Sequence, residues 1–136
     1  MLYNKSINNY FKNTLTNTQK AIWALRIGVA GEFLGHGVLA LQGKADWIGW
    51  FAKFGVSDVG TAAILLTLVG IMDIIVAIVV LIKPIKPILL WAVFWGFWTA
   101  LVRPIVGQPI WDFIERFANW GAPLALYFLL KREQNK

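Results

Sequence analysis

The chain has 136 residues, of which 58% are hydrophobic, 15% aromatic and 15% charged, a composition too apolar for a soluble domain of this length. Its formal net charge of +6 comes mostly from the tails and short loops, so it indicates membrane topology and argues against nucleic-acid binding. The absence of cysteine excludes disulfides, thiol redox relays and cysteine-held metals or clusters within the chain.

The first 20 residues are polar and lack the apolar core and small-residue cleavage site of a signal peptide. Apolar side chains recur within them at helical spacing, which fits either a short amphipathic helix on the membrane surface or a disordered tail. These side chains are Tyr3, Ile7, Tyr10, Phe11 and Leu15. Because no signal peptide is expected, we predict that the first apolar stretch remains in the mature protein as a membrane helix.

The stretch 21–41 is long enough to cross a bilayer, which takes roughly 20 residues. Glu32 lies about 16 Å from its start, near the middle of the hydrocarbon, at a rise of ~1.5 Å per residue. His36, the single histidine of the chain, follows one turn later. An ionisable group at this depth is costly and points to a function or to a buried partner. Gly31 and Gly35 lie beside it as a pair of small residues, so we expect a neighbouring helix to approach closely there.

Residues 42–60 connect the first apolar stretch to the second and contain a short helix with one aromatic face. Trp47, Trp50, Phe51 and Phe54 follow the i, i+3, i+4, i+7 spacing of that face. Because tryptophan prefers the level of the lipid headgroups, we expect this short helix to lie in the membrane interface.

Three further apolar stretches follow, and we expect them to be the other three membrane helices. Ser57 or Asp58 can cap the first of them, since their side-chain oxygens accept free amide protons. A basic turn with two prolines, residues 83–87, ends that helix and begins the next. The stretches are residues 61–82, 87–102 and 110–130, and residues 131–136 form a solvated tail.

The sequence thus predicts an all-α integral membrane four-helix bundle, with one transmembrane domain over residues 21–130. With both termini on one side, that side holds eight cations and the opposite side holds three. The positive-inside rule then places both termini in the cytoplasm of a multi-pass protein of the bacterial inner membrane. The eight are Lys5, Lys12, Lys20, Lys83, Lys86, Lys131, Arg132 and Lys136, and the three are Lys44, Lys53 and Arg103.

In this orientation, polar residues from all four helices gather in the outer half of the bundle. Asp73 lies about 18 Å from the outer end of its helix, level with Glu32. Together with His36, these two acids are the candidates for handling protons. We expect an outward-opening polar pocket lined by tryptophan. Its candidate lining and ligand-binding residues are Trp95, Trp98, Thr99, Arg103, Asp112, Glu115, Arg116 and Asn119.

Other interpretations of the same residues stay open. In a purely structural network, Glu32 bonds His36 or a cation on another helix, and Asp73 meets Arg26 or Arg103. Within the helices, however, four acids face three arginines, so one acid lacks a fixed cation unless the histidine is protonated. The acids are Glu32, Asp73, Asp112 and Glu115, and the arginines are Arg26, Arg103 and Arg116. We expect no metal site, because no HxxxH or HExxH motif accompanies the histidine. The central tryptophans either pack against lipid and protein or stack on a flat ligand such as a quinone ring.

Six short motifs are distributed along the chain: residues 25–28 (Leu-Arg-Ile-Gly), 36–37 (His-Gly), 50–56 (Trp-Phe-Ala-Lys-Phe-Gly-Val), 70–73 (Gly-Ile-Met-Asp), 98–104 (Trp-Thr-Ala-Leu-Val-Arg-Pro) and 115–124 (Glu-Arg-Phe-Ala-Asn-Trp-Gly-Ala-Pro-Leu). Together they resemble those of a known family of small four-helix membrane proteins, the DoxX-like family. Where relatives usually carry glutamate in the second helix, this chain has Asp73, which keeps the charge but is one methylene shorter.

The resemblance implies a membrane bundle linked to redox systems. Some relatives are membrane subunits of a thiosulfate:quinone oxidoreductase, and others associate with oxidative-stress enzymes. We therefore expect an accessory subunit in the lipid bilayer, with a quinone as candidate cofactor and a membrane or periplasmic redox protein as partner. The resemblance assigns no catalytic residue, so enzymatic activity stays an open question. The alternatives are a small-molecule or proton-coupled transporter or channel component, working as a homo-oligomer, and a structural scaffold.

Overall fold

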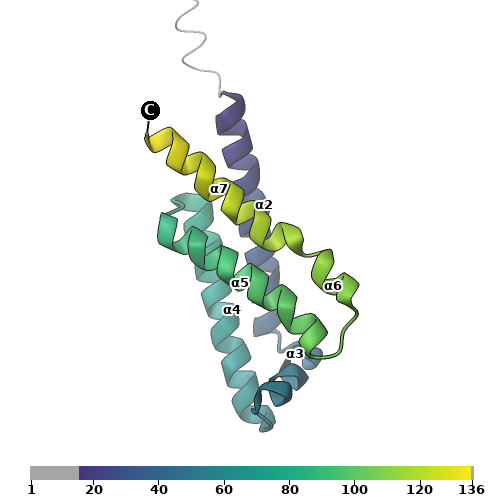
Figure 1. Ribbon diagram of the computed structural model, residues 1–136. Coiled ribbons are helices and arrows are strands. Elements are labelled where there is room, and N and C mark those ends of the chain that lie inside the picture. Colours follow the sequence, from purple (N-terminus) through teal and green to yellow (C-terminus); the bar gives the residue numbers. More distant parts are fainter. Residues whose placement is uncertain (1–15, 136) are drawn as a thin grey trace, which may run out of the picture.

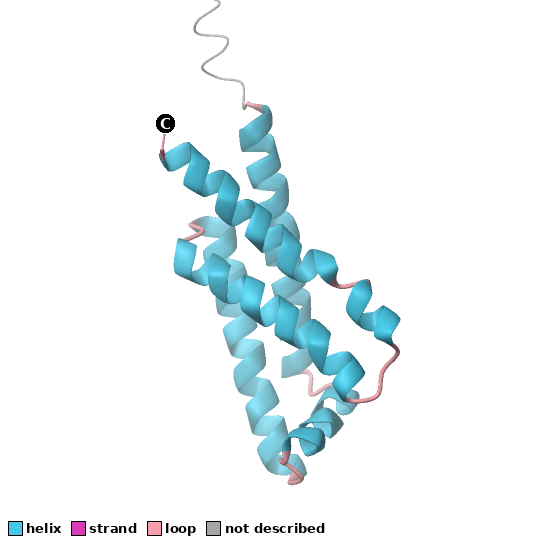
Figure 2. Ribbon diagram, in the orientation of Figure 1, coloured by secondary structure: helices cyan, strands magenta, loops and turns pink. Residues whose placement is uncertain are grey.

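The computed structural model describes residues 16–135, and all regular structure in that range is helical, as expected (Figures 1 and 2). The prediction for the N-terminal segment falls almost wholly on residues 1–15, outside the described residues. The helices are α2 (Asn17–Leu41), α3 (Ala45–Trp50), the 3-10 helix η1 (Phe51–Phe54), α4 (Val59–Ile82), α5 (Lys86–Ile105), α6 (Ile110–Ile114) and α7 (Phe117–Gln134).

Helix α2 begins four residues before the predicted apolar stretch because a capping box starts it. The Gln19 backbone N–H donates to Thr16 Oγ1 at 3.2 Å, and the Thr16 N–H donates to Gln19 Oε1 at 2.9 Å. The helix ends at Leu41, where Gly43 takes a left-handed φ of 68°. This turn directs the chain into α3 and so places the aromatic helix against the bundle.

Both ends of α4 are held by side chains. The Thr61 backbone N–H and hydroxyl each donate to Asp58 Oδ2 at 2.7 Å, which confirms Asp58 as the cap. At the other end, the Arg26 guanidinium from α2 donates to the carbonyls of residues 80–82. A cation is stabilising there because the last carbonyls of a helix lack backbone partners.

The sequence predicts one continuous fourth helix over residues 110–130. This prediction is wrong, because the structure has two helices there, α6 and α7, separated at Glu115 and Arg116. In a regular helix the Arg116 backbone N–H would bond the Asp112 carbonyl. Here the Arg116 side chain donates to that carbonyl at 2.6 Å, and its backbone N–H bonds Phe113 at 3.2 Å instead. The guanidinium also pairs with Glu115, so the side chain of Arg116 stabilises the break.

The predicted third helix runs past its expected end at Arg103 and Pro104. A proline removes a single backbone hydrogen bond, and the helix continues to Ile105. It ends where Gly107 adopts a left-handed φ of 96°, with closing bonds back to the last turn. This extension keeps Arg103 on the helix and directs its side chain from a rigid element.

The long helices pack as a chain of pairs: α4 against α2, α2 against α7, and α7 against α5. Helices α4 and α5 diverge from the turn that connects them, and α3 with η1 lies at the wide end between them (Figure 1). The bundle is therefore least tightly closed along the α4–α5 seam.

The close helix approaches occur at other glycines than the sequence predicts. A Cβ on Gly37 of α2 would lie 2.9 Å from the Gly70 carbonyl oxygen of α4, and a Cβ on Gly70 would lie 2.9 Å from the Gly37 oxygen. The predicted pair, Gly31 and Gly35, is exposed, with no neighbouring atom within 4 Å of a Cβ. That prediction is wrong because the pair lies on the face of α2 turned away from α4 and α7.

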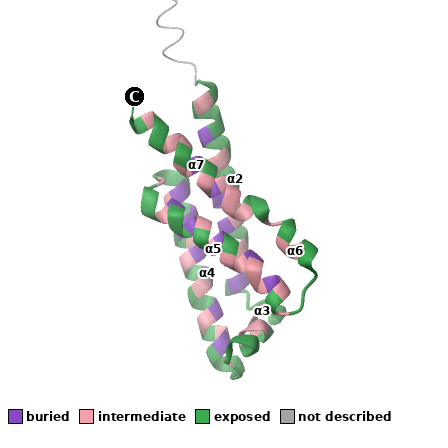
Figure 3. Ribbon diagram, viewed as in Figure 1, coloured by how far each residue is buried: buried purple, intermediate pink, exposed green. Residues whose placement is uncertain are grey.

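Among residues 16–135, three helices are long and apolar enough to cross a membrane: α2, α4 and α5. Their buried side chains line the helix contacts, while large aliphatic side chains point outward, such as Ile27 at 61% and Ile64 at 65% exposed (Figure 3). A bilayer would cover this surface, so the chain is a multi-pass membrane protein. Helix α7 is the fourth long helix of the bundle.

Candidate functional site

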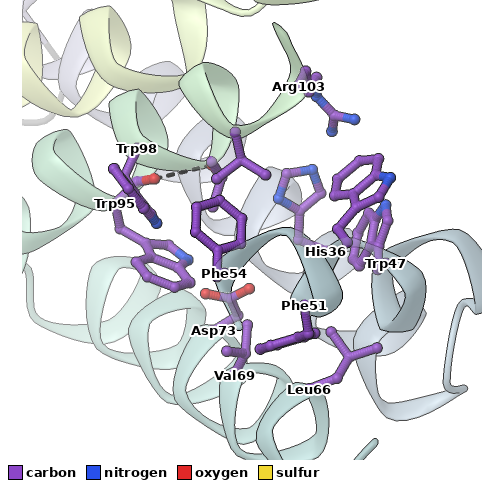
Figure 4. Close-up of a pocket in the computed structure, with 13 residues that line it drawn as sticks. His36, Trp47, Phe51, Phe54, Leu66, Val69, Asp73, Trp95, Trp98 and Arg103 are labelled. Atoms are coloured by element: carbon purple, nitrogen blue, oxygen red, sulfur yellow. Dashed lines mark hydrogen bonds between the residues drawn. The ribbon is translucent and has the colours of Figure 1, made fainter. Parts of the chain in front are cut away.

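A cavity of about 360 Å³ lies between α2, α4 and α5, and α3 and η1 form a further part of its wall (Figure 4). Its size falls within the range of small-molecule sites. The walls are mostly aromatic and aliphatic, with a few polar groups among them. The aromatic residues are Trp47, Trp50, Phe51, Phe54, Trp95 and Trp98, and the polar ones are His36, Asp73, Thr99 and Arg103.

The aromatic face of α3 and η1 forms one wall of this cavity. Phe54 packs against Trp98 of α5, with ring centroids 6.1 Å apart. His36 of α2 meets Trp47 edge to face at 5.5 Å. The face that the sequence analysis assigned to the membrane interface therefore also joins α2 to α5 across the cavity.

Asp73 is the most deeply buried acid of the described chain, at 2% exposed. Its Oδ1 has no hydrogen-bond partner within residues 16–135, and neither has the Trp95 indole Nε1. Figure 4 shows the indole nitrogen turned towards the carboxylate. No ion pair within the same range joins Asp73 to Arg26 or to Arg103, so the structural network proposed for this acid is not formed.

Arg103 reaches the cavity from the last turn of α5 and is 8% exposed. Its guanidinium carbon lies 5.4 Å from the centroid of the Trp50 ring, a cation–π contact. Its Nε has no partner among the described residues. Thr99, by contrast, uses its hydroxyl locally, donating to the Trp95 carbonyl at 2.9 Å (Figure 4).

Two polar atoms of the cavity, Asp73 Oδ1 and Arg103 Nε, thus have no hydrogen-bond partner among residues 16–135. A third, Trp95 Nε1, faces the carboxylate without meeting it in a hydrogen bond of ordinary geometry. An unsatisfied buried polar group costs about 1–3 kcal/mol, and more when it is charged. Native structures retain few such groups, so each one calls for an explanation. A ligand that accepts hydrogen bonds at one end and donates at the other would satisfy all three.

The structure divides the predicted site residues into two groups. His36, Asp73 and the four predicted residues of α5 line the cavity. Glu32 is half-buried on α2, outside the lining, and has no hydrogen bond or ion pair within residues 16–135. The residues of the predicted fourth helix also lie outside the lining: Asp112, Glu115 and Arg116 meet at the α6–α7 break, and Asn119 packs its backbone against Gly96.

Sequence reasoning missed two kinds of lining residue. The aromatic face of α3 and η1 carried a usable signal, because four rings at helical spacing fit a docked helix as well as a membrane interface. The aliphatic residues Leu66, Val69 and Val102 carried none, because they resemble every other apolar position of their helices.

No group of three or more His, Asp or Glu side chains lies close enough to hold a metal ion in the part of the chain that the structure describes. His36 therefore has no second and third protein ligand among residues 16–135.

Comparison with known proteins agrees with the four motifs between residues 25 and 73 and does not reach the two between residues 98 and 124. No curated protein and no solved structure matches the chain. The model of one family, DoxX, matches residues 21–94, which is more than half of the chain. The match covers α2, α3, η1, α4 and the first half of α5, including His36 and Asp73. The chain therefore belongs to the DoxX family of integral membrane proteins.

Proposed function

We propose that this DoxX family protein binds a lipid-soluble quinone in the cavity and acts as the membrane-embedded accessory subunit of a redox system. The observation that carries the proposal is the set of three unpartnered buried atoms in aromatic walls: Asp73 Oδ1, Trp95 Nε1 and Arg103 Nε. The Trp95 indole N–H turns towards the Asp73 carboxylate (Figure 4). A bound molecule that accepts from Arg103 Nε and donates to Asp73 Oδ1 would supply the partners that these atoms lack among residues 16–135.

The residues present fit a quinone. Its flat ring matches walls built of tryptophan and phenylalanine, which stack on aromatic rings. Trp95 and Arg103 supply N–H donors for carbonyl oxygens, and Asp73 supplies an acceptor for the hydroxyl of the reduced form. When bound, a quinone supplies two-electron, two-proton carrier chemistry, and the protein residues bind and orient it.

Protons would pass through the ionisable groups of the cavity. His36 and Asp73 both line it, so each is placed to take a proton from a bound hydroxyl or to return one. Glu32 lies outside the lining on the same helix as His36, one turn away. We assign it to proton exchange between the cavity and its surroundings.

We further propose that both termini lie in the cytoplasm. The start of α2, the end of α7 and the α4–α5 turn lie towards one end of the bundle, and α3 lies at the other (Figure 1). The first end carries Lys20, Lys83, Lys86, Lys131 and Arg132. The positive-inside rule then places the cavity in the outer half of the membrane, where a periplasmic or membrane redox protein is the partner.

Equilibrium dialysis of the purified protein in micelles against a tailless dimethoxy-methyl-benzoquinone tests this proposal. Trp95→Phe keeps a ring but removes the N–H, so we expect binding to weaken several-fold, up to about tenfold, for one lost hydrogen bond. Trp111→Phe is the matched control, because Trp111 is 71% exposed on α6 and lies outside the cavity. Absence of saturable binding, or equal affinity in all three proteins, would overturn the proposal.

A second candidate is a proton-coupled transporter, which Glu32 favours because no hydrogen bond or ion pair joins it to another side chain in the part of the chain that the structure describes. A carboxylate without a partner in a membrane helix suits reversible protonation. Solute uptake that is driven by a proton gradient in liposomes and lost in Glu32→Gln would support it. If Glu32→Gln and Arg116→Ala lower the stability of the protein but change neither quinone binding nor solute uptake, the protein is a structural scaffold.

A further inference from the structure

A second, shallower groove of about 370 Å³ lies between α4 and α5. Leu68, Ile71 and Ile75 of α4 form one side, and Ile88 and Trp91 of α5 form the other. None of the side chains lining the groove is charged or carries a hydroxyl. The three α4 residues are between 46% and 57% exposed, so the groove is open to the surrounding lipid.

The groove and the cavity share a wall. Trp91 lines the groove and Trp95 lines the cavity, and the two indoles stack with centroids 5.6 Å apart and planes 14° apart. On α4 the two linings are also neighbours in sequence, since Met72 faces the groove and Asp73 faces the cavity. The stacked rings of Trp91 and Trp95 therefore form the α5 part of the wall between the lipid-facing groove and the cavity.

This wall lies on the seam where the helix backbones leave the most room. Helices α4 and α5 diverge from their connecting turn (Figure 1), and they pack against each other less extensively than α4 against α2, α2 against α7 or α7 against α5. Two indole side chains can change rotamer without any helix moving, because χ rotation is far cheaper than separating packed helices. The α4–α5 seam is accordingly the easiest side from which a molecule dissolved in the bilayer can reach Asp73.

We propose that the ligand of the cavity enters laterally through the α4–α5 seam and keeps a long apolar tail in the groove while its polar head lies in the cavity. The occupant of the groove is thus the tail of the same molecule rather than a bulk lipid chain. The inference rests on the proposed function for the chemistry of the head, and it adds that the natural ligand is an amphiphile with an extended hydrocarbon tail.

Photolabelling in phosphatidylcholine nanodiscs tests the inference. The probe is a benzoquinone with a decyl tail that ends in a diazirine, and the labelled positions are mapped by peptide mass spectrometry. We expect labelling of residues 68–76 and 88–91 that an excess of the untagged decyl quinone displaces. Ile71→Trp fills the groove and should abolish this displaceable labelling. Ile64→Trp is the matched control on the same helix, exposed and outside the groove, and should retain it.

Labelling spread over the exposed faces of all the long helices, or displaceable labelling that survives Ile71→Trp, would overturn the inference. Thermal unfolding of Ile71→Trp and Ile64→Trp side by side shows whether either substitution disturbs the fold. The two proposals fail separately. If the tailless ring binds but the tail does not label the groove, the lateral site is wrong. If the tail labels the groove but the tailless ring does not bind, the quinone assignment is wrong and the lateral site stands.

Discussion

The sharpest test of the packing is the contact between α5 and α7 at Gly96. A Cβ at this position would lie 2.5 Å from the Asn119 carbonyl oxygen and 2.9 Å from the Asn119 carbonyl carbon. Both are backbone atoms of α7, which cannot rotate away as a side chain can. Gly96→Ala therefore forces the two helices apart.

The cost can be worked out from that geometry. Ordinary van der Waals contact begins at 3.4 Å, so α7 must retreat by about 0.9 Å. Overpacking of this kind costs about 1–3 kcal/mol, and backbone contacts place it at the upper end. The higher helix propensity of alanine offsets roughly 1 kcal/mol of this overpacking cost. We expect a net loss of about 1–2 kcal/mol in the free energy of unfolding.

Reversible unfolding by sodium dodecyl sulfate in mixed micelles, followed by circular dichroism, measures this loss. Gly28→Ala is the matched control, because no atom lies within 4 Å of its Cβ. It should be neutral or stabilising by up to about 1 kcal/mol. A Gly96→Ala protein as stable as the wild type, or a Gly28→Ala protein destabilised to the same extent, would refute the packing of α5 on α7.

Three further predictions follow from particular side chains. Arg26→Gln removes the guanidinium from the last carbonyls of α4 and should lower the unfolding free energy by about 1–3 kcal/mol in the same assay. Hydrogen bonds from the Thr61 hydroxyl and backbone N–H hold the pKa of Asp58 below its usual range. The cap therefore stabilises the fold at pH values above the pKa that Asp58 has in the unfolded chain. This stabilisation is lost as the pH falls through the pKa that Asp58 has in the folded protein. Asp58→Asn should flatten this acid dependence of the melting temperature, and an unchanged slope would contradict the cap. Asp73→Leu replaces a buried acid whose Oδ1 has no hydrogen-bond partner among residues 16–135, and it should raise the unfolding free energy by about 1–3 kcal/mol while abolishing quinone binding in dialysis. A protein less stable than the wild type would show that Asp73 has a structural partner.

The sequence was enough to locate the long helices because each is a long apolar run bounded by a cap, a proline or a glycine. It could not reveal the break at Arg116. The apolar pattern continues through that position, and the break depends on a side chain that replaces a backbone donor at the Asp112 carbonyl. The prediction of the close helix contact was also wrong, since it named Gly31 and Gly35 and the contact lies at Gly37 and Gly70. A small residue shows that a neighbouring helix can approach, but it does not show on which face of the helix that neighbour lies.

The candidate site was predictable where one helical face carries it. His36, Asp73 and Arg103 converge because each lies on the inward face of a long helix, and periodicity shows such faces. The polar residues around Arg116 were expected in the same pocket but lie outside its lining. The aromatic helix α3 occupies that side instead, and its docking is a tertiary contact that no local pattern distinguishes from a place at the membrane interface.

If the buried polar groups of the cavity hold a lipid-soluble ligand, that ligand should stay bound when the protein is purified from its own membrane. The direct measurement is mass spectrometry of the small molecules that remain bound when the protein is purified from its own membrane. We expect the wild type and Ile64→Trp to carry a ring-bearing amphiphile of quinone mass, and Asp73→Leu to lack it. Ordinary phospholipids alone, or the same bound molecule in Asp73→Leu as in the wild type, would contradict the claim.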